Sequence, residues 1–142
     1  MNILLAYDSL SGGTKKLAEN IYSYLDPKHI IDMEHVTKQE YDPDILFSKH
    51  YDIYILGSWT ANRGRTAPRM KRFIGHMVNN IGKPPNVVVF GTGETQFGEE
   101  FFCGGAWRMH AFFNSSFEPL LIEQFPTSRD QQKIKSWVEL FN

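Results

Sequence analysis

The chain has 142 residues, of which 42% are hydrophobic and 22% are charged. These values are typical of a globular protein, and the length predicts one domain that spans residues 1–142. Fifteen basic and sixteen acidic residues give a net charge of −1. The overall charge therefore gives no reason to expect a nucleic-acid or membrane partner.

The number and spacing of the cysteine, histidine and apolar residues exclude several further classes of protein. No apolar run reaches the roughly 20 residues of a membrane span, and the first residues lack the basic segment of a signal peptide. The single cysteine excludes an internal disulfide and a multi-cysteine zinc site. The five histidines lack the spacing of metal ligands. We therefore expect a cytoplasmic protein without a metal.

Strands and helices are predicted to alternate along the chain. Short apolar runs that end in turn residues predict strands at residues 2–7, 30–33, 51–56, 86–90 and 120–124. Apolar residues at helical spacing predict helices at residues 14–25, 68–79, 104–114 and 128–140. Pro68 is suited to the first turn of its helix, and Ser128 is the expected N-cap of the last helix. The polar stretch 37–48 predicts no defined element.

This alternation predicts an α/β domain with a parallel sheet and right-handed crossovers. The strands are almost continuously apolar, as expected for a sheet that is buried on both faces. Ligands of such sheets bind beyond the carboxyl ends of the strands. The loops that follow the strands are therefore the candidate sites.

The first of these loops has the composition of an anion site. Residues 8–14, Asp-Ser-Leu-Ser-Gly-Gly-Thr, come directly before the first helix. Such a loop offers backbone N–H donors, to which the helix dipole adds. It lacks the Gly-Lys-Ser/Thr of a P-loop and the Gly-x-Gly-x-x-Gly of dinucleotide folds, so a monophosphate fits better. An ordinary capped turn is the alternative.

Two further loops each contain an aromatic residue outside any strand or helix pattern. Trp59 follows the third strand, and Phe97 follows the fourth within Gly-Thr-Gly-Glu-Thr-Gln-Phe-Gly. Both side chains are suited to a flat heteroaromatic ligand. The alternative for Trp59 is that it folds back over the end of the sheet. Beside an anion loop, the two aromatics predict one flat phosphorylated ligand.

The first loop resembles the phosphate loop of flavodoxins, in which hydroxyl residues precede Gly-x-Thr. Residues 91–97, with Phe102-Cys103-Gly104 and Ala106 after them, are similar to the third flavin loop of short-chain flavodoxins. The order of strands and helices agrees over essentially the whole chain. The resemblance implies a three-layer α/β sandwich, with a five-stranded parallel sheet in the order 2-1-3-4-5, and noncovalently bound FMN.

The resemblance also implies which residues bind FMN. The first loop would hold the phosphate, and the other two would line the two sides of the isoalloxazine, with Phe97 stacked on the ring. The implied cofactor-binding residues are Ser9, Leu10, Ser11, Gly12, Gly13, Thr14, Ser58, Trp59, Thr60, Ala61, Asn62, Thr92, Gly93, Glu94, Phe97 and Cys103. From its sequence surroundings alone, Cys103 is expected to be a small buried apolar residue.

Flavodoxins carry single electrons between protein partners. The resemblance therefore implies an electron donor such as a flavodoxin reductase, an acceptor enzyme, and a monomeric carrier rather than an enzyme.

Two features depart from the flavodoxin pattern. Many flavodoxins have a Gly-Asp pair in the second loop, where this chain has Ala61-Asn62-Arg63. Asn62 is the residue there that tolerates a positive φ, as a redox-linked peptide flip requires. Residues 63–72 also include five basic residues and no acid, whereas flavodoxins are commonly strongly acidic.

Those positive charges affect the expected reduction potential. A unit charge about 8 Å from the flavin contributes about 2 kcal/mol at an effective dielectric near 20, roughly 90 mV for one electron. Salt screening weakens this effect. We therefore expect a less negative second potential than in acidic flavodoxins; arginines that point into solvent are the alternative.

A second resemblance implies a different role. The small flavodoxin-like activator of manganese ribonucleotide reductase (NrdI) has a loop that ends in a Pro-led helix, similar to residues 66–69, and a stretch similar to residues 93–98. That family uses reduced FMN and oxygen to supply an oxidant to ribonucleotide reductase. The segment Phe102-Cys103-Gly104 favours a flavodoxin. Receiver domains share the topology but need an acidic cluster, and Asp8 is a lone acid after the first strand.

Overall fold

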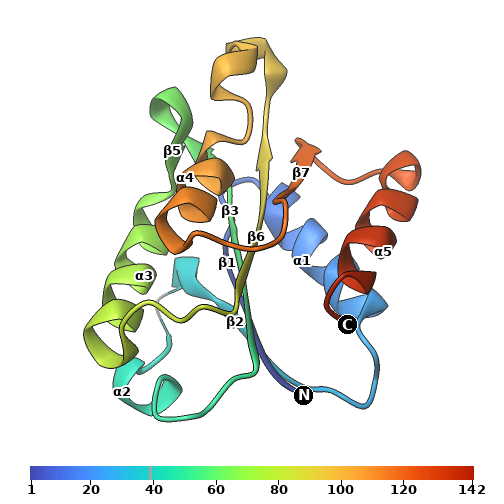
Figure 1. The fold of residues 1–142 in the computed structure, drawn as a ribbon. Helices are drawn as coiled ribbons and strands as arrows, with labels where there is room; N and C mark the ends of the chain where they lie inside the picture. Colours follow the sequence, from blue (N-terminus) through green and yellow to red (C-terminus); the bar gives the residue numbers. More distant parts are fainter. Residues whose placement is uncertain (39) are drawn as a thin grey trace.

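A parallel sheet forms the middle layer of the protein in a computed structural model that describes residues 1–38 and 40–142 (Figure 1). The order of its five strands is β2-β1-β3-β6-β7, which confirms the predicted order because β6 and β7 are the fourth and fifth predicted strands. The strands are β1 (Asn2–Asp8), β2 (Ile30–His35), β3 (Ile53–Ser58), β6 (Val87–Gly93) and β7 (Leu120–Glu123). All neighbouring pairs in the sheet are parallel.

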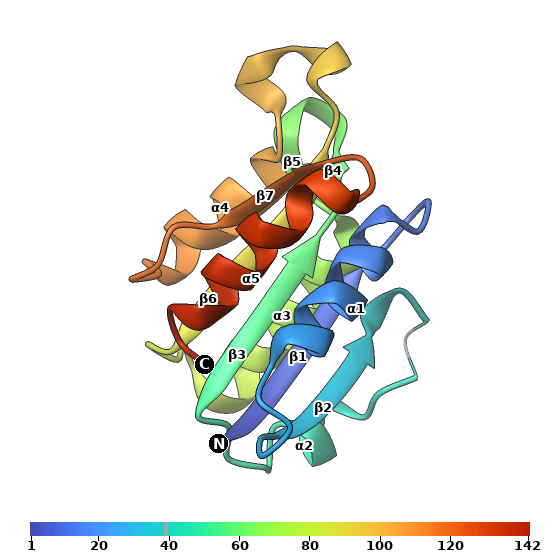
Figure 2. The same cartoon turned by 90° about the vertical axis from the view of Figure 1, so that its right-hand side faces the viewer.

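Helices cover both faces of the sheet (Figures 1 and 2). One face is covered by α1 (Gly13–Tyr24) and α5 (Gln131–Glu139). The other is covered by α3 (Pro68–Ile81) and α4 (Gly104–Phe113), with the short helix α2 (Pro43–Leu46) at its edge. This confirms the predicted three-layer sandwich. No helix within residues 1–38 and 40–142 combines the length and the apolar character needed to cross a membrane.

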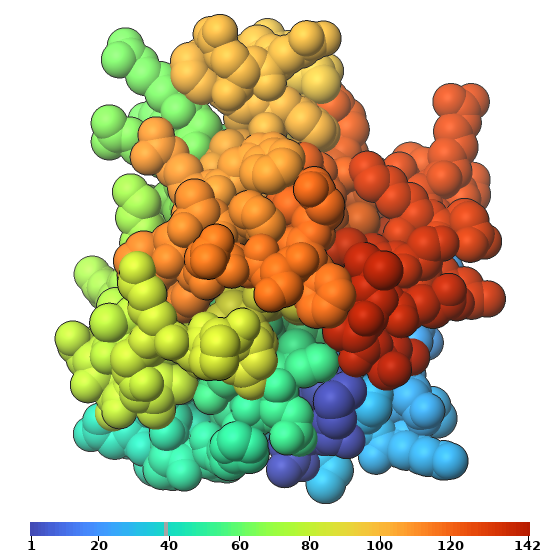
Figure 3. Space-filling model, viewed as in Figure 1, coloured from blue at the N-terminus to red at the C-terminus, as the bar shows by residue number. Residues whose placement is uncertain are grey.

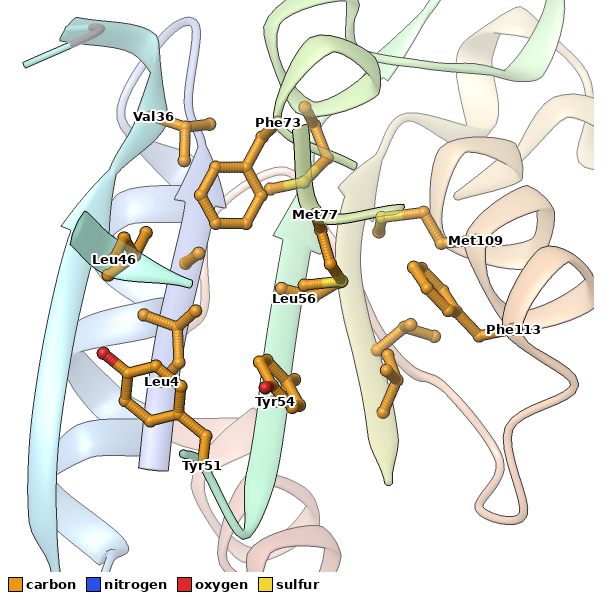
Figure 4. Close-up of a cluster of buried hydrophobic side chains, with 14 of the residues drawn as sticks. Leu4, Val36, Leu46, Tyr51, Tyr54, Leu56, Phe73, Met77, Met109 and Phe113 are labelled. Carbon is orange, nitrogen blue, oxygen red and sulfur yellow. The ribbon is translucent and has the colours of Figure 1, made fainter. Parts of the chain in front are cut away.

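The alternation of side chains along each strand divides the core into two parts. In β3, Tyr54 and Leu56 face α3 and α4, whereas Ile55 faces α1 and α5. Figure 4 shows Phe73 and Met77 of α3 packed over the first of these faces. Because both faces are covered by apolar helix surfaces, the strands are apolar at nearly every position.

The differences from the predicted elements have local causes. The polar stretch 37–48 contains α2, which Asp42 caps by accepting hydrogen bonds from the N–H groups of Asp44 and Ile45; position 39 lies outside the described residues. Ser128 as the last N-cap is wrong. Thr127 caps the 3-10 turn that leads into α5, and Asp130 accepts a hydrogen bond from the Thr127 N–H to complete a capping box. Asp130 is in turn the N-cap of α5 and provides it with no side-chain cap. Ser128 instead begins the short 3-10 helix η5 (Ser128–Asp130) that precedes α5.

The loop after β3 is also more regular than predicted. It forms a two-stranded antiparallel ribbon of β4 (Thr60–Ala61) and β5 (Arg65–Thr66), joined by the 3-10 turn η2 (Asn62–Gly64). Two residues per strand give no detectable periodicity in a sequence. This ribbon, called the β4–β5 ribbon below, lies at the carboxyl edge of the main sheet (Figure 2).

Asp8 connects the carboxyl end of β1 to three other segments. It is 2% exposed. One carboxylate oxygen accepts hydrogen bonds from Thr37 Oγ1 at 2.7 Å and Trp59 Nε1 at 3.2 Å, and the other accepts one from the Met70 N–H at 3.1 Å. Met70 is the third residue of α3, whose N-cap Ala67 provides no side-chain cap. Asp8 therefore caps α3 from another element, where a negative charge is favourable.

We predict that Asp8→Ala lowers the free energy of unfolding by about 2–4 kcal/mol, because it leaves buried donors of Trp59 and Met70 without an acceptor. Asp8→Asn keeps one acceptor oxygen and is expected to cost less. Asp44→Ala, at an exposed position, serves as the control and is expected to cost under about 1 kcal/mol. Urea unfolding followed by circular dichroism measures all three. Equal losses in the Asp8→Ala and Asp44→Ala variants would contradict this role.

Candidate functional site

Four loops that follow parallel strands meet at one edge of the sheet and enclose a pocket of about 500 Å³. In Figure 1 this edge is at the top, where residues 94–102 project furthest from the sheet. Pockets of this volume accommodate cofactors and other small molecules. The pocket is lined by Leu10, Ser11, Trp59, Thr60, Ala61, Asn62, Arg63, Gly64, Thr92, Gly93, Glu94, Phe97, Phe101, Gln124 and Phe125.

The loop after β1 presents unused backbone donors. None of the N–H groups of residues 10–14 has a hydrogen-bond partner among the described residues. Gly12 has a φ of 99° and serves as the N-cap of α1 without a side-chain cap. A left-handed residue next to helical ones turns successive N–H groups toward one point, where the helix dipole adds to them. This arrangement favours an anion.

Three predicted residues of this loop lie behind the pocket. Ser9 Oγ accepts a hydrogen bond from the Lys15 N–H at 3.1 Å, and Thr14 Oγ1 shares one with Thr92 Oγ1 at 2.8 Å. A Cβ on Gly13 would lie 2.2 Å from the Gln124 carbonyl oxygen, so only glycine fits there. The side chains of Ser9 and Thr14 therefore fix the loop, while Leu10 and Ser11 reach the pocket.

Trp59 lies at the start of the second loop and is held at two points. Its indole N–H donates to Asp8, and its backbone N–H donates to the Asp8 carbonyl oxygen at 3.3 Å. The side chain is partly buried against the core, so it covers the end of the sheet, and it also lines the pocket. Ser58 is fully buried, and its hydroxyl donates to the Trp59 carbonyl and accepts from the Ala67 N–H.

The β4–β5 ribbon is fixed against the first turn of α4. Thr60 Oγ1 donates to the Thr92 carbonyl at 2.9 Å and accepts from the Gly105 N–H at 3.3 Å. A Cβ on Gly104 would lie 2.4 Å from the Gly64 carbonyl oxygen, so the two backbones are in direct contact. Within the ribbon, positive φ falls at Arg63 (54°) and Gly64 (76°) rather than at Asn62. The two left-handed residues are therefore the last two of the turn η2.

The third loop carries an aromatic side chain that the rest of the described chain leaves uncovered. Phe97 is 68% exposed and ends the 3-10 helix η3 (Thr95–Phe97). Thr95 fixes the start of this turn by donating from both its N–H and its hydroxyl to Glu123 Oε1. Glu94 lines the pocket and accepts a hydrogen bond from the Gln96 side chain. The loop thus places an exposed ring at the pocket beside a carboxylate.

Cys103 lies behind the third loop, outside the pocket lining. It is fully buried, and its thiol is 3.7 Å from the Gly91 carbonyl oxygen and 3.8 Å from that of Ile122. Burial raises the pKa of the thiol to about 12, so the thiol stays protonated at neutral pH. A Cβ on Gly93 would lie 2.6 Å from the Cys103 nitrogen, which explains the glycine there. Within the described residues, no group of three or more His, Cys, Asp or Glu side chains is placed to hold a metal ion.

Five of the lining residues were not predicted from the sequence: Arg63, Gly64, Phe101, Gln124 and Phe125. Gln124 has a φ of 52°, and its N–H donates to the Gly93 carbonyl at 2.8 Å, which joins the end of β7 to the third loop. Phe125 is 48% exposed. As an aromatic residue beyond a predicted strand, it carries the same signal that singled out Trp59 and Phe97. Gly64 and Gln124 line the pocket because of their backbone conformation, which the sequence does not predict.

The chain resembles solved flavodoxins over nearly its full length. It matches the flavodoxin domain family over residues 4–128. Oxidised flavodoxin 1 from Bacillus cereus is 20% identical, with a TM-score of 0.81 over 98% of this chain and 95% of that one. Oxidised flavodoxin 2 from the same organism is 29% identical, with a TM-score of 0.79 over 99% and 97%.

A third structure, a Fusobacterium nucleatum flavodoxin mutant bound to flavin mononucleotide, is 14% identical, with a TM-score of 0.70 over 97% and 93% of the two chains. No curated protein sequence matches significantly. The family match covers most of the chain and agrees with the order of its strands. This chain therefore belongs to the flavodoxin family.

Proposed function

We propose that this chain binds FMN noncovalently and carries single electrons between redox partner proteins in the cytoplasm, as one domain over residues 1–142. The proposal is supported by two features that lie next to each other, a group of backbone donors and an aromatic pocket. Unused N–H groups at residues 10–14 lie beside a pocket that four aromatic residues, Trp59, Phe97, Phe101 and Phe125, help to line. A phosphate on a flat ring system satisfies both features.

The residues present fit the two ends of FMN. The N–H groups of residues 10–14 would hold the phosphate without a lysine, because a dianion at a helix N-terminus is stabilised by backbone donors and the helix dipole. Trp59, whose orientation Asp8 fixes, would line one side of the ring, and the exposed Phe97 would cover the other. When bound, FMN supplies reversible electron transfer, and the protein tunes its potential through packing, hydrogen bonds and charge.

The pocket charges are placed to influence that potential. Arg63 and Glu94 both line the pocket and carry opposite charges. Arg63 is exposed, so solvent and salt weaken its effect relative to a buried charge. Arg65, Arg69, Lys71 and Arg72 are exposed as well and lie outside the lining. Of the five basic residues in this stretch, Arg63 is therefore the one expected to act on the flavin.

The phosphate site predicts a preference for FMN over riboflavin. We expect the flavin-free protein to bind one FMN, and to bind riboflavin about 100-fold more weakly, because riboflavin lacks the group that accepts charge-assisted hydrogen bonds. Gly12→Ala places a β-carbon at a φ of 99°, which costs on the order of 1–2 kcal/mol. This variant should weaken FMN binding about tenfold and leave riboflavin binding unchanged. Quenching of flavin fluorescence measures both affinities; equal affinity for the two flavins would refute the phosphate site.

The role as a carrier predicts that electrons flow from a donor protein through this protein to an acceptor protein. We expect the FMN-loaded protein to accept electrons from NADPH through a flavodoxin reductase and to pass them to cytochrome c, which stopped-flow absorbance follows. The flavin-free protein is the control and should transfer none. Failure of reduction by the reductase, together with co-elution with the small subunit of ribonucleotide reductase, would instead support the activator role.

The position of Arg63 predicts a charge effect on the second reduction step. Arg63→Gln should make the second potential more negative, on the order of 20–60 mV, because a cation beside the pocket stabilises added negative charge. Arg69→Gln removes the same charge from a position outside the lining and should shift the potential less. Spectroelectrochemical titration in low salt measures both. Equal shifts in the two variants would exclude a local effect of Arg63.

A further inference from the structure

Basic residues gather on one side of the molecule. Between β3 and the end of β6, residues 53–93 contain no Asp or Glu, and residues 101–117 contain none either. These stretches include the β4–β5 ribbon, α3 and α4, which lie next to one another in the fold (Figure 1). The basic face defined by them comprises the exposed residues Arg63, Arg65, Arg69, Lys71, Arg72, Lys83 and Arg108.

Because of the basic face, charge is distributed unevenly over the protein. Its seven residues are drawn from a total of fifteen, which leaves eight basic residues against sixteen acidic residues in the rest of the sequence. Acidic residues adjoin its Arg63 end, where Glu94 shares the flavin pocket and residues 99–101 contact the turn η2. None of the seven forms an ion pair with a described residue. A face with uncompensated charge of one sign attracts a surface of the opposite sign.

An apolar groove of about 460 Å³ lies within the basic face, between α3 and α4. Ile74 and Val78 line it from α3, and Met109 and Phe112 line it from α4. Gly75 widens the groove, because a Cβ at this position would meet no atom within 4 Å. Both helices reach the face of the molecule that Figure 3 presents.

Cations border the groove. Lys71 and Arg108 belong to its lining, and the Lys83 ammonium lies 3.9 Å from the centroid of the Phe112 ring. The lysine covers one face of the ring and closes that face to a stacking nucleobase. The groove therefore has apolar walls bordered by positive charges. It complements an apolar side chain flanked by carboxylates better than it complements a nucleic acid.

We propose that this groove docks a redox partner protein through an acidic segment that inserts one apolar side chain between α3 and α4. The proposal rests on the carrier function proposed above and adds the chemistry of the partner. Arg108 connects the groove to the flavin pocket, since its Nε donates at 3.0 Å to the carbonyl oxygen of Gly64, which lines that pocket. A partner in the groove thus lies against the β4–β5 ribbon, one wall of the electron-transfer site.

The test measures binding of a rhodamine-labelled peptide, Glu-Glu-Glu-Phe-Leu-Glu-Glu-Glu, to the FMN-loaded protein by fluorescence anisotropy in low salt. We expect binding that weakens about tenfold when Phe and Leu of the peptide are replaced by Ser. The charge variant Lys71→Glu with Lys83→Glu should also weaken binding at least about tenfold. The matched control Lys28→Glu with Lys135→Glu, which changes the same charge away from the groove, should change binding less than about twofold.

The variant Gly75→Leu separates the groove from the charge. It fills the groove and keeps every cation, and leucine is a better helix former than glycine; we expect it to weaken peptide binding at least about fivefold. Peptide affinity that is insensitive to Gly75→Leu, or tighter binding of a ten-residue thymidine oligonucleotide, would overturn the inference. Flavin absorbance of each variant tests the proposed function separately, because the groove residues lie outside the flavin pocket.

Discussion

The buried carboxylate of Asp8 is the interaction on which the geometry of the site depends. It lies at the end of the interior strand β1, and it holds the indole of Trp59 and the first turn of α3 at the same time. A charged group at 2% exposure is costly unless its hydrogen bonds are made. Here the donors come from segments far apart in the sequence. The hydrogen bonds that stabilise the buried Asp8 carboxylate therefore also position Trp59, which forms one wall of the pocket.

Close backbone contacts determine how the remaining walls meet. Gly93 lies against Cys103, and Gly104 lies against Gly64, at distances that leave no space for a side chain. The β4–β5 ribbon, the third loop and the start of α4 are therefore packed backbone against backbone. Such close packing leaves these short segments little room to shift relative to one another.

The fold was largely predictable, because burial on both faces leaves an apolar run for each strand and an apolar stripe for each helix. Of the pocket lining, the sequence predicted residues with a local signal, such as Ser11 before α1 and the loop aromatics Trp59 and Phe97. It missed Gln124, whose contribution comes from a left-handed backbone and a hydrogen bond to Gly93. Thr127 was missed as a cap because Ser128 next to it has the same chemistry, and only backbone geometry separates them.

The contact between Gln124 and Gly13 makes the anion loop near the start of the chain depend on a residue near its end. A ribosome releases the first loop long before it synthesises β7. While the nascent chain grows, the loop after β1 therefore lacks its contact with Gln124. The native form of this loop is then completed only after β7 has docked, so capture of a cofactor during synthesis would be delayed until that strand has emerged.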